Sequence, residues 1–160
     1  MESKSTGKKF LIGCGIVGAV MGLVCLVGFI GFMVWLATSP EGGVTMGNEI
    51  ETYALEYIAE HNLVRESEDI IAYYDATIAL DGSEAAILTT ERVIYHKDDR
   101  TTWIELKDIE DIQHRNEGLV GDIIEVKGQA GKRLKIEIAP FNQGESFYNA
   151  LIDAWEAAQQ

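Results

Sequence analysis

Apolar residues divide the chain into one long uninterrupted run and a following region of mixed periodicity. From residue 10 to residue 37 no position is charged, and Leu, Ile, Val, Phe and Gly predominate. A helix of about 20 apolar residues crosses the hydrocarbon core of a bilayer, whereas helices in globular domains average about 11–12 residues. The pattern therefore predicts a transmembrane helix over residues 10–37.

Two processed signals are the competing interpretations of this run. One is a secretory signal that ends at the small residues 37–39, and the other is a lipoprotein signal with Cys14 as its lipidated residue. Signal peptides have apolar regions of about 7–15 residues, which is shorter than this run. Only residues 10–13 separate Cys14 from the preceding lysines. An uncleaved anchor explains the pattern better than either signal.

Charge asymmetry sets the expected orientation of the span. Lys4, Lys8 and Lys9 precede it, and no Lys or Arg follows it before Arg65. Basic flanks remain on the cytoplasmic side of a membrane. We therefore expect a cytoplasmic tail over residues 1–9 and an extracytoplasmic C-terminal domain, in a single-pass protein of the cell membrane.

Small residues mark one face of the predicted span. At 100° per residue, Gly15, Gly18, Gly22 and Cys25 fall on one narrow face. Gly18 and Gly22 have GxxxG spacing, which lets two helix backbones approach closely, although glycine is common in membrane spans generally. We expect this face to pack against a second copy or against other membrane subunits, while the rest of the span contacts lipid.

The next two segments read as a linker and a helix. Residues 38–47 contain one proline and three glycines, which is typical of a flexible linker. Residues 48–64 repeat apolar side chains at helical spacing, with Asn48 as the expected N-cap, and predict an amphipathic helix. Its apolar stripe is expected to pack on the following domain; docking onto a partner is the alternative.

From about residue 70 the periodicity is typical of strands. Candidate strands cover residues 70–80, 84–90, 92–96, 101–106, 109–114, 123–127 and 133–138. Asn142 and Glu145 have the spacing of a capping box and predict a closing helix. The expected fold over residues 65–160 is an α+β, mainly β domain of about seven antiparallel strands capped by a C-terminal helix.

Three segments resemble a known family: residues 87–95 (ILTTERVIY), residues 103–109 (WIELKDI) and residues 147–155 (FYNALIDAW). Together they resemble the bacterial pleckstrin-homology-like (PH/GRAM-like) domains over roughly residues 70–158. The resemblance implies a small bent antiparallel barrel closed by a helix, a scaffold that binds phosphoinositides, peptides or protein surfaces. The motifs themselves are structural and carry no chemistry.

Charge restricts the classes of partner. The chain has 13 basic and 26 acidic residues and a net charge of −13, yet its mean hydropathy is +0.01 because the apolar run offsets the acidic domain. An excess of acid argues against nucleic-acid binding. Lipid-binding members of the resembled family carry basic residues around the loop between the first two strands. Here that loop is Asp81-Gly82-Ser83-Glu84, which would repel phosphate.

Candidate chemistry is sparse elsewhere. Lys127, Lys132, Arg133 and Lys135 gather at the last hairpin, either as a solvated edge or as a contact for acidic partners or lipid headgroups. The three histidines are scattered, and both cysteines, Cys14 and Cys25, lie in the predicted span. We therefore expect no catalytic residues, metal or cofactor.

The resulting functional prediction is a non-enzymatic membrane protein. Its PH-like domain would contact other proteins, as an accessory or structural subunit of a larger membrane complex. The alternative is a lipid- or ligand-binding sensor module that uses the basic hairpin 127–135. A weaker alternative is an acidic domain tuned by Ca²⁺ or by salt.

Overall fold

The computed structural model describes residues 25–30 and 42–160. The chain divides into two units, residues 1–40 and residues 41–160, which are treated separately. In the first unit residues 25–30 are helical and exposed. Most of the predicted span, including Gly15, Gly18 and Gly22, lies outside the described residues. Within those described, no helix has the length and apolar character needed to cross a membrane.

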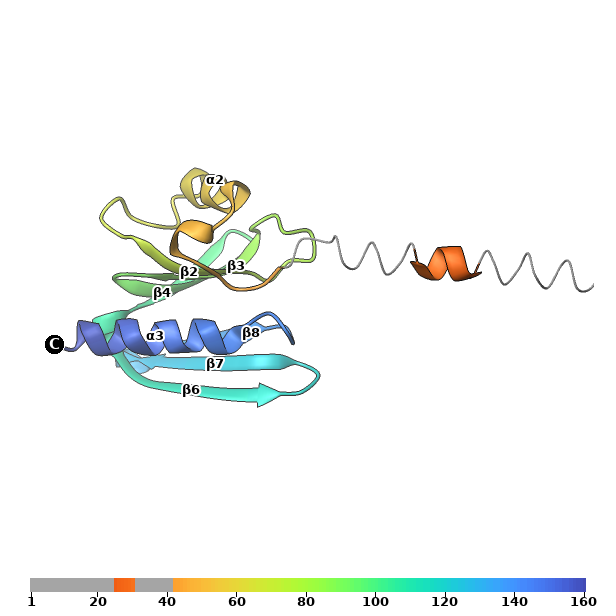
Figure 1. The fold of residues 1–160 in the computed structure, drawn as a ribbon. Coiled ribbons are helices and arrows are strands. Elements are labelled where there is room, and N and C mark those ends of the chain that lie inside the picture. The colour runs from red at the N-terminus through yellow and green to blue at the C-terminus, as the bar shows by residue number, and fades with distance from the viewer. Residues whose placement is uncertain (1–24, 31–41) are drawn as a thin grey trace, which may run out of the picture. The chain divides into compact units, whose positions relative to one another are not determined.

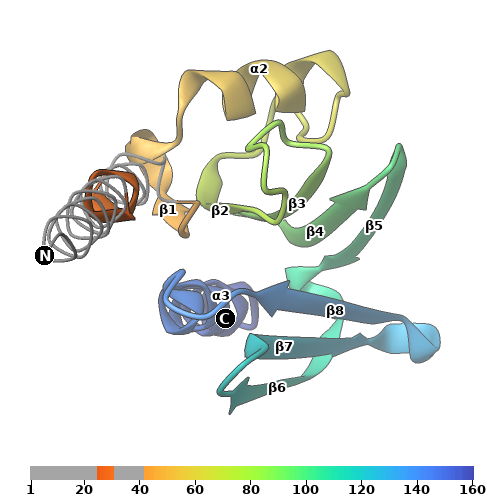
Figure 2. The ribbon, with the colours of Figure 1, turned by 90° about the vertical axis from the view of Figure 1, so that its right-hand side faces the viewer.

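Two antiparallel sheets form the second unit (Figures 1 and 2). The first sheet comprises β1 (Thr45–Met46), β2 (Ile70–Asp75), β3 (Glu84–Thr89), β4 (Arg92–Lys97) and β5 (Arg100–Glu105). The second comprises β6 (Ile109–Glu117), β7 (Gly121–Gly128) and β8 (Arg133–Ile138). Within each sheet every strand pairs with its neighbour in sequence, so the order along the chain is also the order in space.

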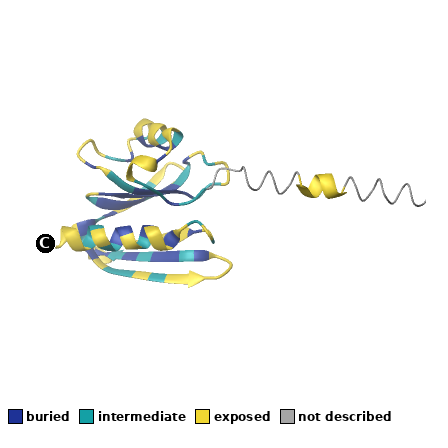
Figure 3. Ribbon diagram, viewed as in Figure 1, coloured by how far each residue is buried: buried dark blue, intermediate teal, exposed yellow. Residues whose placement is uncertain are grey.

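Burial of the strands shows which faces are covered. In β3 every residue after Glu84 is buried, because both faces of the first sheet are covered. One face is covered by α2 (Thr52–Glu60), and the other by the second sheet together with α3 (Gly144–Ala158). β8 instead alternates exposed and buried positions, as expected for a strand with one solvated face. In Figure 3 the strands of the first sheet are largely dark blue, whereas β6 of the second sheet is mostly teal and yellow.

The main core lies between the sheets and α3. Phe147 and Leu151 of α3 are fully buried there, against Ile124 and Ile136 of the second sheet and Leu88 of the first. Full burial of one such side chain stabilises the fold by about 1.5–3 kcal/mol. The broad apolar stripe predicted for the closing helix therefore covers the space between two sheets.

A smaller core lies beneath α2. Ala54 and Ile58 of this helix are buried against β2, β3 and β4, so its apolar stripe packs on its own domain. The helix begins after Glu51 and not at the predicted cap, Asn48, because a short 3₁₀ turn, η1 (Gly47–Glu49), occupies that segment. It ends where Asn62 adopts a positive φ of 51°, as residues after a helix C-terminus commonly do.

The predicted barrel is wrong, because the two sheets remain separate. After β5 the chain passes through a 3₁₀ turn, η2 (Leu106–Asp108), and β6 then pairs with β7 alone. The mainly β composition and the C-terminal helix are as expected.

The first predicted strand is too long. It was expected over residues 70–80, but β2 ends at Asp75. The Asp75 carboxylate accepts hydrogen bonds from the backbone N–H of Thr77 and of Gly82, at 2.8 Å each. These bonds hold residues 76–83 as a loop, which competes with extension of the strand.

The predicted capping box at the start of α3 does not form. The N-cap is Gln143, in the left-handed region at φ 60°, and it makes no side-chain capping hydrogen bond. The carbonyl of Asn142 accepts a hydrogen bond from the N–H of Val44 at 3.0 Å, which joins the helix start to the beginning of the described domain.

Candidate functional site

The predicted basic cluster lies at the turn between β7 and β8. Lys127 is opposite Arg133 in the ladder, and its ammonium pairs with the Asp111 carboxylate at 2.8 Å. This hydrogen bond holds the pKa of Asp111 below its usual value. Lys135 pairs with a glutamate two residues further along β8. Of the four basic residues, Lys132 and Arg133 alone take part in no ion pair within residues 42–160.

A shallow groove of about 220 Å³ lies beside this cluster. Its lining residues are Glu125, Val126, Lys127, Arg133, Leu134 and Lys135. Glu125 lies opposite Lys135 in the ladder and accepts a hydrogen bond from Arg115 at 2.7 Å. Small-molecule sites usually enclose about 300–1,000 Å³. The groove is therefore better suited to a surface contact than to an enclosed ligand.

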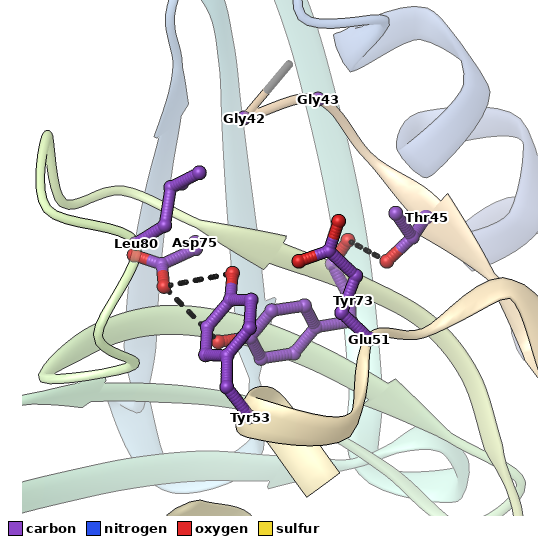
Figure 4. A pocket seen from close by; sticks show the side chains of 8 residues that line it. All are labelled: Gly42, Gly43, Thr45, Glu51, Tyr53, Tyr73, Asp75 and Leu80. Atoms are coloured by element: carbon purple, nitrogen blue, oxygen red, sulfur yellow. Dashed lines mark hydrogen bonds between the residues drawn. The ribbon is translucent and has the colours of Figure 1, made fainter. Parts of the chain in front are cut away.

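A second, much smaller cavity lies between the start of the domain, α2 and β2 (Figure 4). Its volume is about 20 Å³, which is enough for about one water molecule. Its lining residues are Gly42, Gly43, Thr45, Glu51, Tyr53, Tyr73, Asp75 and Leu80. The Tyr53 and Tyr73 hydroxyls donate hydrogen bonds to Oδ2 of Asp75 at 3.3 and 3.5 Å.

The electrostatics of this cavity indicate a structural role. Burial, and then the charge of Asp75, raise the pKa of the Tyr53 and Tyr73 phenols. Both phenols therefore stay protonated and act as donors at neutral pH. Asp75 accepts from these phenols and also from the N–H and hydroxyl of Thr77 and the N–H of Gly82. One buried carboxylate thus joins α2, β2 and the loop 76–83.

A buried histidine contacts α2 one helical turn after Tyr53. His96 is 1% exposed, with Nε2 lying 3.2 Å from the Tyr57 hydroxyl and Nδ1 lying 3.0 Å from the Thr101 hydroxyl. Burial, and then the neighbouring His61, lower the pKa of His96. In the described part of the chain no three His, Cys, Asp or Glu side chains come together as metal ligands would.

A buried ion pair connects the segment after α2 to the start of β4. Nε of Arg92 lies 2.7 Å from Oε1 of Glu68, and the two side chains are only 7% and 0% exposed. Arg92 also donates to the carbonyl of Leu63 at 3.2 Å, and its guanidinium lies 5.5 Å from the centre of the Trp103 ring. This network places a charge pair within the fold, away from any cavity described above.

The sequence did not single out one further feature, which we call the loop end. It consists of three loops, residues 76–83, 118–120 and 139–143, together with Gly42 and Gly43, where the described domain begins. In Figure 1 these segments lie at the right-hand end of the domain, and in Figure 2 they face the viewer. Ile78, Leu119 and Phe141 are fully exposed there, at 104, 99 and 100%. Ile78 lies within the predicted strand 70–80, Leu119 precedes Val120 in a short turn, and Phe141 lies between a proline and an asparagine, so no shared periodicity marks the three as one surface.

Comparison with known proteins assigns the domain to a class. The family model described as "Bacterial PH domain" matches residues 64–153, more than half of the chain. The chain therefore belongs to the bacterial PH domain family, as the three resembling segments predicted. None of the curated proteins compared with the chain matches it.

A solved structure supports the same fold. The crystal structure of a DUF1696 family protein with a pleckstrin-homology domain, from Shewanella loihica, matches with a TM-score of 0.50 and 13% sequence identity. The match covers 71% of this chain and 98% of that one. At this identity the likeness concerns the fold alone.

Proposed function

We propose that this protein is a single-pass membrane protein that presents a PH-like protein-interaction domain on the extracytoplasmic side. It would act without catalysis, as an accessory or structural subunit of a larger membrane complex. The observation that carries the proposal is that a bacterial PH domain, residues 64–153, follows an uncharged apolar run over residues 10–37 in the same chain.

Two further observations support the anchor and the interaction role. The helical residues 25–30 expose Leu26, Val27, Phe29 and Ile30, side chains that favour lipid over water. In the domain, the polar clusters around Asp75 and His96 are hydrogen-bonded within the fold. Its outer surfaces therefore remain the parts suited to contact with other proteins.

The first experiment tests the anchor and its orientation. Full-length protein in native membranes should resist extraction at alkaline pH, and protease added to intact cells should remove the C-terminal domain. Release by alkaline extraction would refute the anchor. Protection of the domain until the cytoplasm is opened would reverse the orientation.

The second experiment tests association through the glycine face. The double variant Gly18→Leu/Gly22→Leu should reduce self-association or co-purification of partner subunits in a mild detergent. Gly13→Leu/Gly31→Leu is the matched control, because at 100° per residue these two positions fall on the opposite face of the predicted helix. Equal behaviour of the two double variants would refute a role for this face.

The sensor function at hairpin 127–135 is the second candidate. It is favoured by Lys132 and Arg133, which are exposed and form no ion pair within residues 42–160. The pairing of Lys127 with Asp111 weakens it, because a headgroup phosphate would have to displace a carboxylate. Binding of residues 41–160, the unit without the apolar run, to anionic vesicles that is lost in Lys132→Ala/Arg133→Ala but kept in Lys107→Ala would support this alternative.

A further inference from the structure

Three fully exposed apolar side chains at one end of a domain call for an explanation. Single exposed apolar residues are common on soluble proteins, but apolar side chains gathered on one surface mark a contact with a partner or a membrane. Ile78, Leu119 and Phe141 come from three different loops and bury almost none of their surface. Their common location on the loop end is therefore the starting point.

Close backbone contacts hold two of these loops together. Gly121, which ends the loop 118–120, has a φ of 100°, and a Cβ placed on it would lie 2.1 Å from the carbonyl oxygen of Ile138. It would also lie within 3 Å of the backbone of Ala139 and Pro140. Leu119 and Phe141 thus project from loops that touch through their backbones.

The beginning of the domain lies against the other two loops. A Cβ on Gly42 would lie 2.9 Å from the side chain of Leu80, in the loop that carries Ile78. A Cβ on Gly43 would lie 3.9 Å from the carbonyl oxygen of Asn142, the residue after Phe141. The chain therefore enters the domain at the loop end. It does so five residues after the apolar run 10–37, and an extended chain spans at most about 3.3–3.6 Å per residue.

We propose that the loop end seats on the bilayer surface, with Ile78, Leu119 and Phe141 inserted at the boundary between headgroups and acyl chains. The inference rests on the proposed function for the anchor itself. A tether this short keeps the loop end close to the membrane that the anchor occupies. Insertion of three apolar side chains then fixes the orientation of the domain on that membrane.

The loop end has few charged residues, so we expect its contact with the bilayer to be apolar. Residues 76–83, 117–121 and 139–143 contain Asp81 and Glu117 and no Lys or Arg. Attraction of a protein surface to anionic lipid headgroups depends on basic residues near the membrane. These loops carry none, so anionic headgroups should not strengthen their binding to the bilayer. Seating should therefore be the same on zwitterionic and on anionic bilayers.

The same geometry places the basic hairpin away from that bilayer. β7 runs for eight residues from Gly121, beside the loop end, to Gly128, beside the hairpin. At about 3.3 Å per residue, the two ends of this strand are roughly 25 Å apart. Lys132 and Arg133 are then directed away from the membrane, where an acidic protein partner could reach them.

The test uses full-length protein in phosphatidylcholine vesicles. Cys14→Ser and Cys25→Ser remove both native thiols, and Ile78→Cys, Leu119→Cys and Phe141→Cys are each labelled with a polarity-sensitive fluorophore. Lys132→Cys, beyond the far end of β7, and Gln160→Cys, at the C-terminus marked in Figure 1, are both exposed and serve as the controls. Apolar groups at an interface lie about 5–10 Å deep. Lipids with spin-labelled acyl chains should therefore quench the loop probes roughly twofold more than the controls.

Two outcomes would overturn the inference. Loop probes that aqueous iodide quenches as strongly as it does the controls would place the loop end in water. Loop probes shielded from both iodide and spin-labelled lipid would indicate a protein contact in its place. Flotation of the vesicles after an alkaline wash separates this inference from the proposed function. Loss of the protein from the vesicles would refute both. Protein that stays with the vesicles but has water-exposed loop probes would refute the inference alone.

A measurement on the native sequence guards against effects of labelling. In lipid nanodiscs with spin-labelled lipid, the methyl signals of Ile78 and Leu119 should broaden, while that of Ile109, at the far end of β6, should not. Equal broadening of all three signals, or of none, would contradict the seating of the loop end.

Discussion

The ion pair of Glu68 and Arg92 supports the most quantitative prediction. Replacing Arg92 with Ala removes the closest cationic partner of the Glu68 carboxylate, which is 0% exposed, and leaves it only Arg65, a 46% exposed side chain at 3.3 Å. Breaking a buried pair in this way costs about 3–5 kcal/mol. The change also removes the hydrogen bond to the Leu63 carbonyl and the contact with the Trp103 ring. The retained Arg65 contact places the cost at the lower end of this range. For a domain of this size each kcal/mol lowers Tm by about 4 °C, so Arg92→Ala should lower Tm by roughly 12 °C.

The assay is thermal unfolding of full-length protein in a mild detergent, followed by near-UV circular dichroism. Glu68→Gln should cost less than Arg92→Ala, because the amide oxygen can still accept from Arg92, which also keeps the Leu63 carbonyl and the Trp103 ring as partners. In the double variant Glu68→Met/Arg92→Met no unpaired charge remains, so its Tm should lie above that of Arg92→Ala. A Tm of the double variant at or below that of Arg92→Ala would refute the reasoning.

Three further predictions follow from single residues. Asp75→Ala should cost about 2–4 kcal/mol and speed amide exchange across residues 76–83, because buried donors lose their acceptor; unchanged exchange would contradict this. Gly121→Ala should cost about 2 kcal/mol or more by denaturant unfolding. Gly118→Ala, with nothing within 4 Å of the added Cβ, should cost less than about 0.5 kcal/mol. Because the folded pKa of His96 lies below its ordinary 6.5, the unfolded chain binds the extra proton, and stability should fall as the pH drops below 6.5. His96→Gln should flatten that part of the Tm–pH profile, and an unchanged slope would refute the assignment.

Periodicity located most of the strands because a solvated face leaves a clear alternation. β8 occupies the predicted residues 133–138, where apolar and polar side chains alternate strictly. β1 could not be predicted, because a strand of two residues, Thr45 and Met46, has no period. Its existence depends on pairing with Tyr73 and Ala72, which lie far along the chain.

The candidate sites were harder to predict than the strands, because their residues come together only in the tertiary structure. The basic hairpin was visible as a cluster in the sequence, but the pairing of Lys127 with Asp111 was not, because 26 acidic residues offer many possible partners. The loop end was missed for a related reason. Ile78, Leu119 and Phe141 become one surface only when the sheets bring their loops to the same end of the domain.

The alternating charges on the outer face of β7 and β8 also bear on how the strands find their register. A slip by one residue would turn the apolar set of a strand toward solvent, whereas a slip by two keeps the same faces. In the native pairing Glu125 lies opposite Lys135. A two-residue slip that carries β8 toward its own N-terminus would set Glu125 opposite Glu137, and a like-charged pair of this kind destabilises a sheet. Lys127 faces a basic residue in either register, so the discrimination comes from Glu125. The side chains that weaken this surface as an anion site thus help to exclude a misfolded hairpin that the apolar pattern alone would permit.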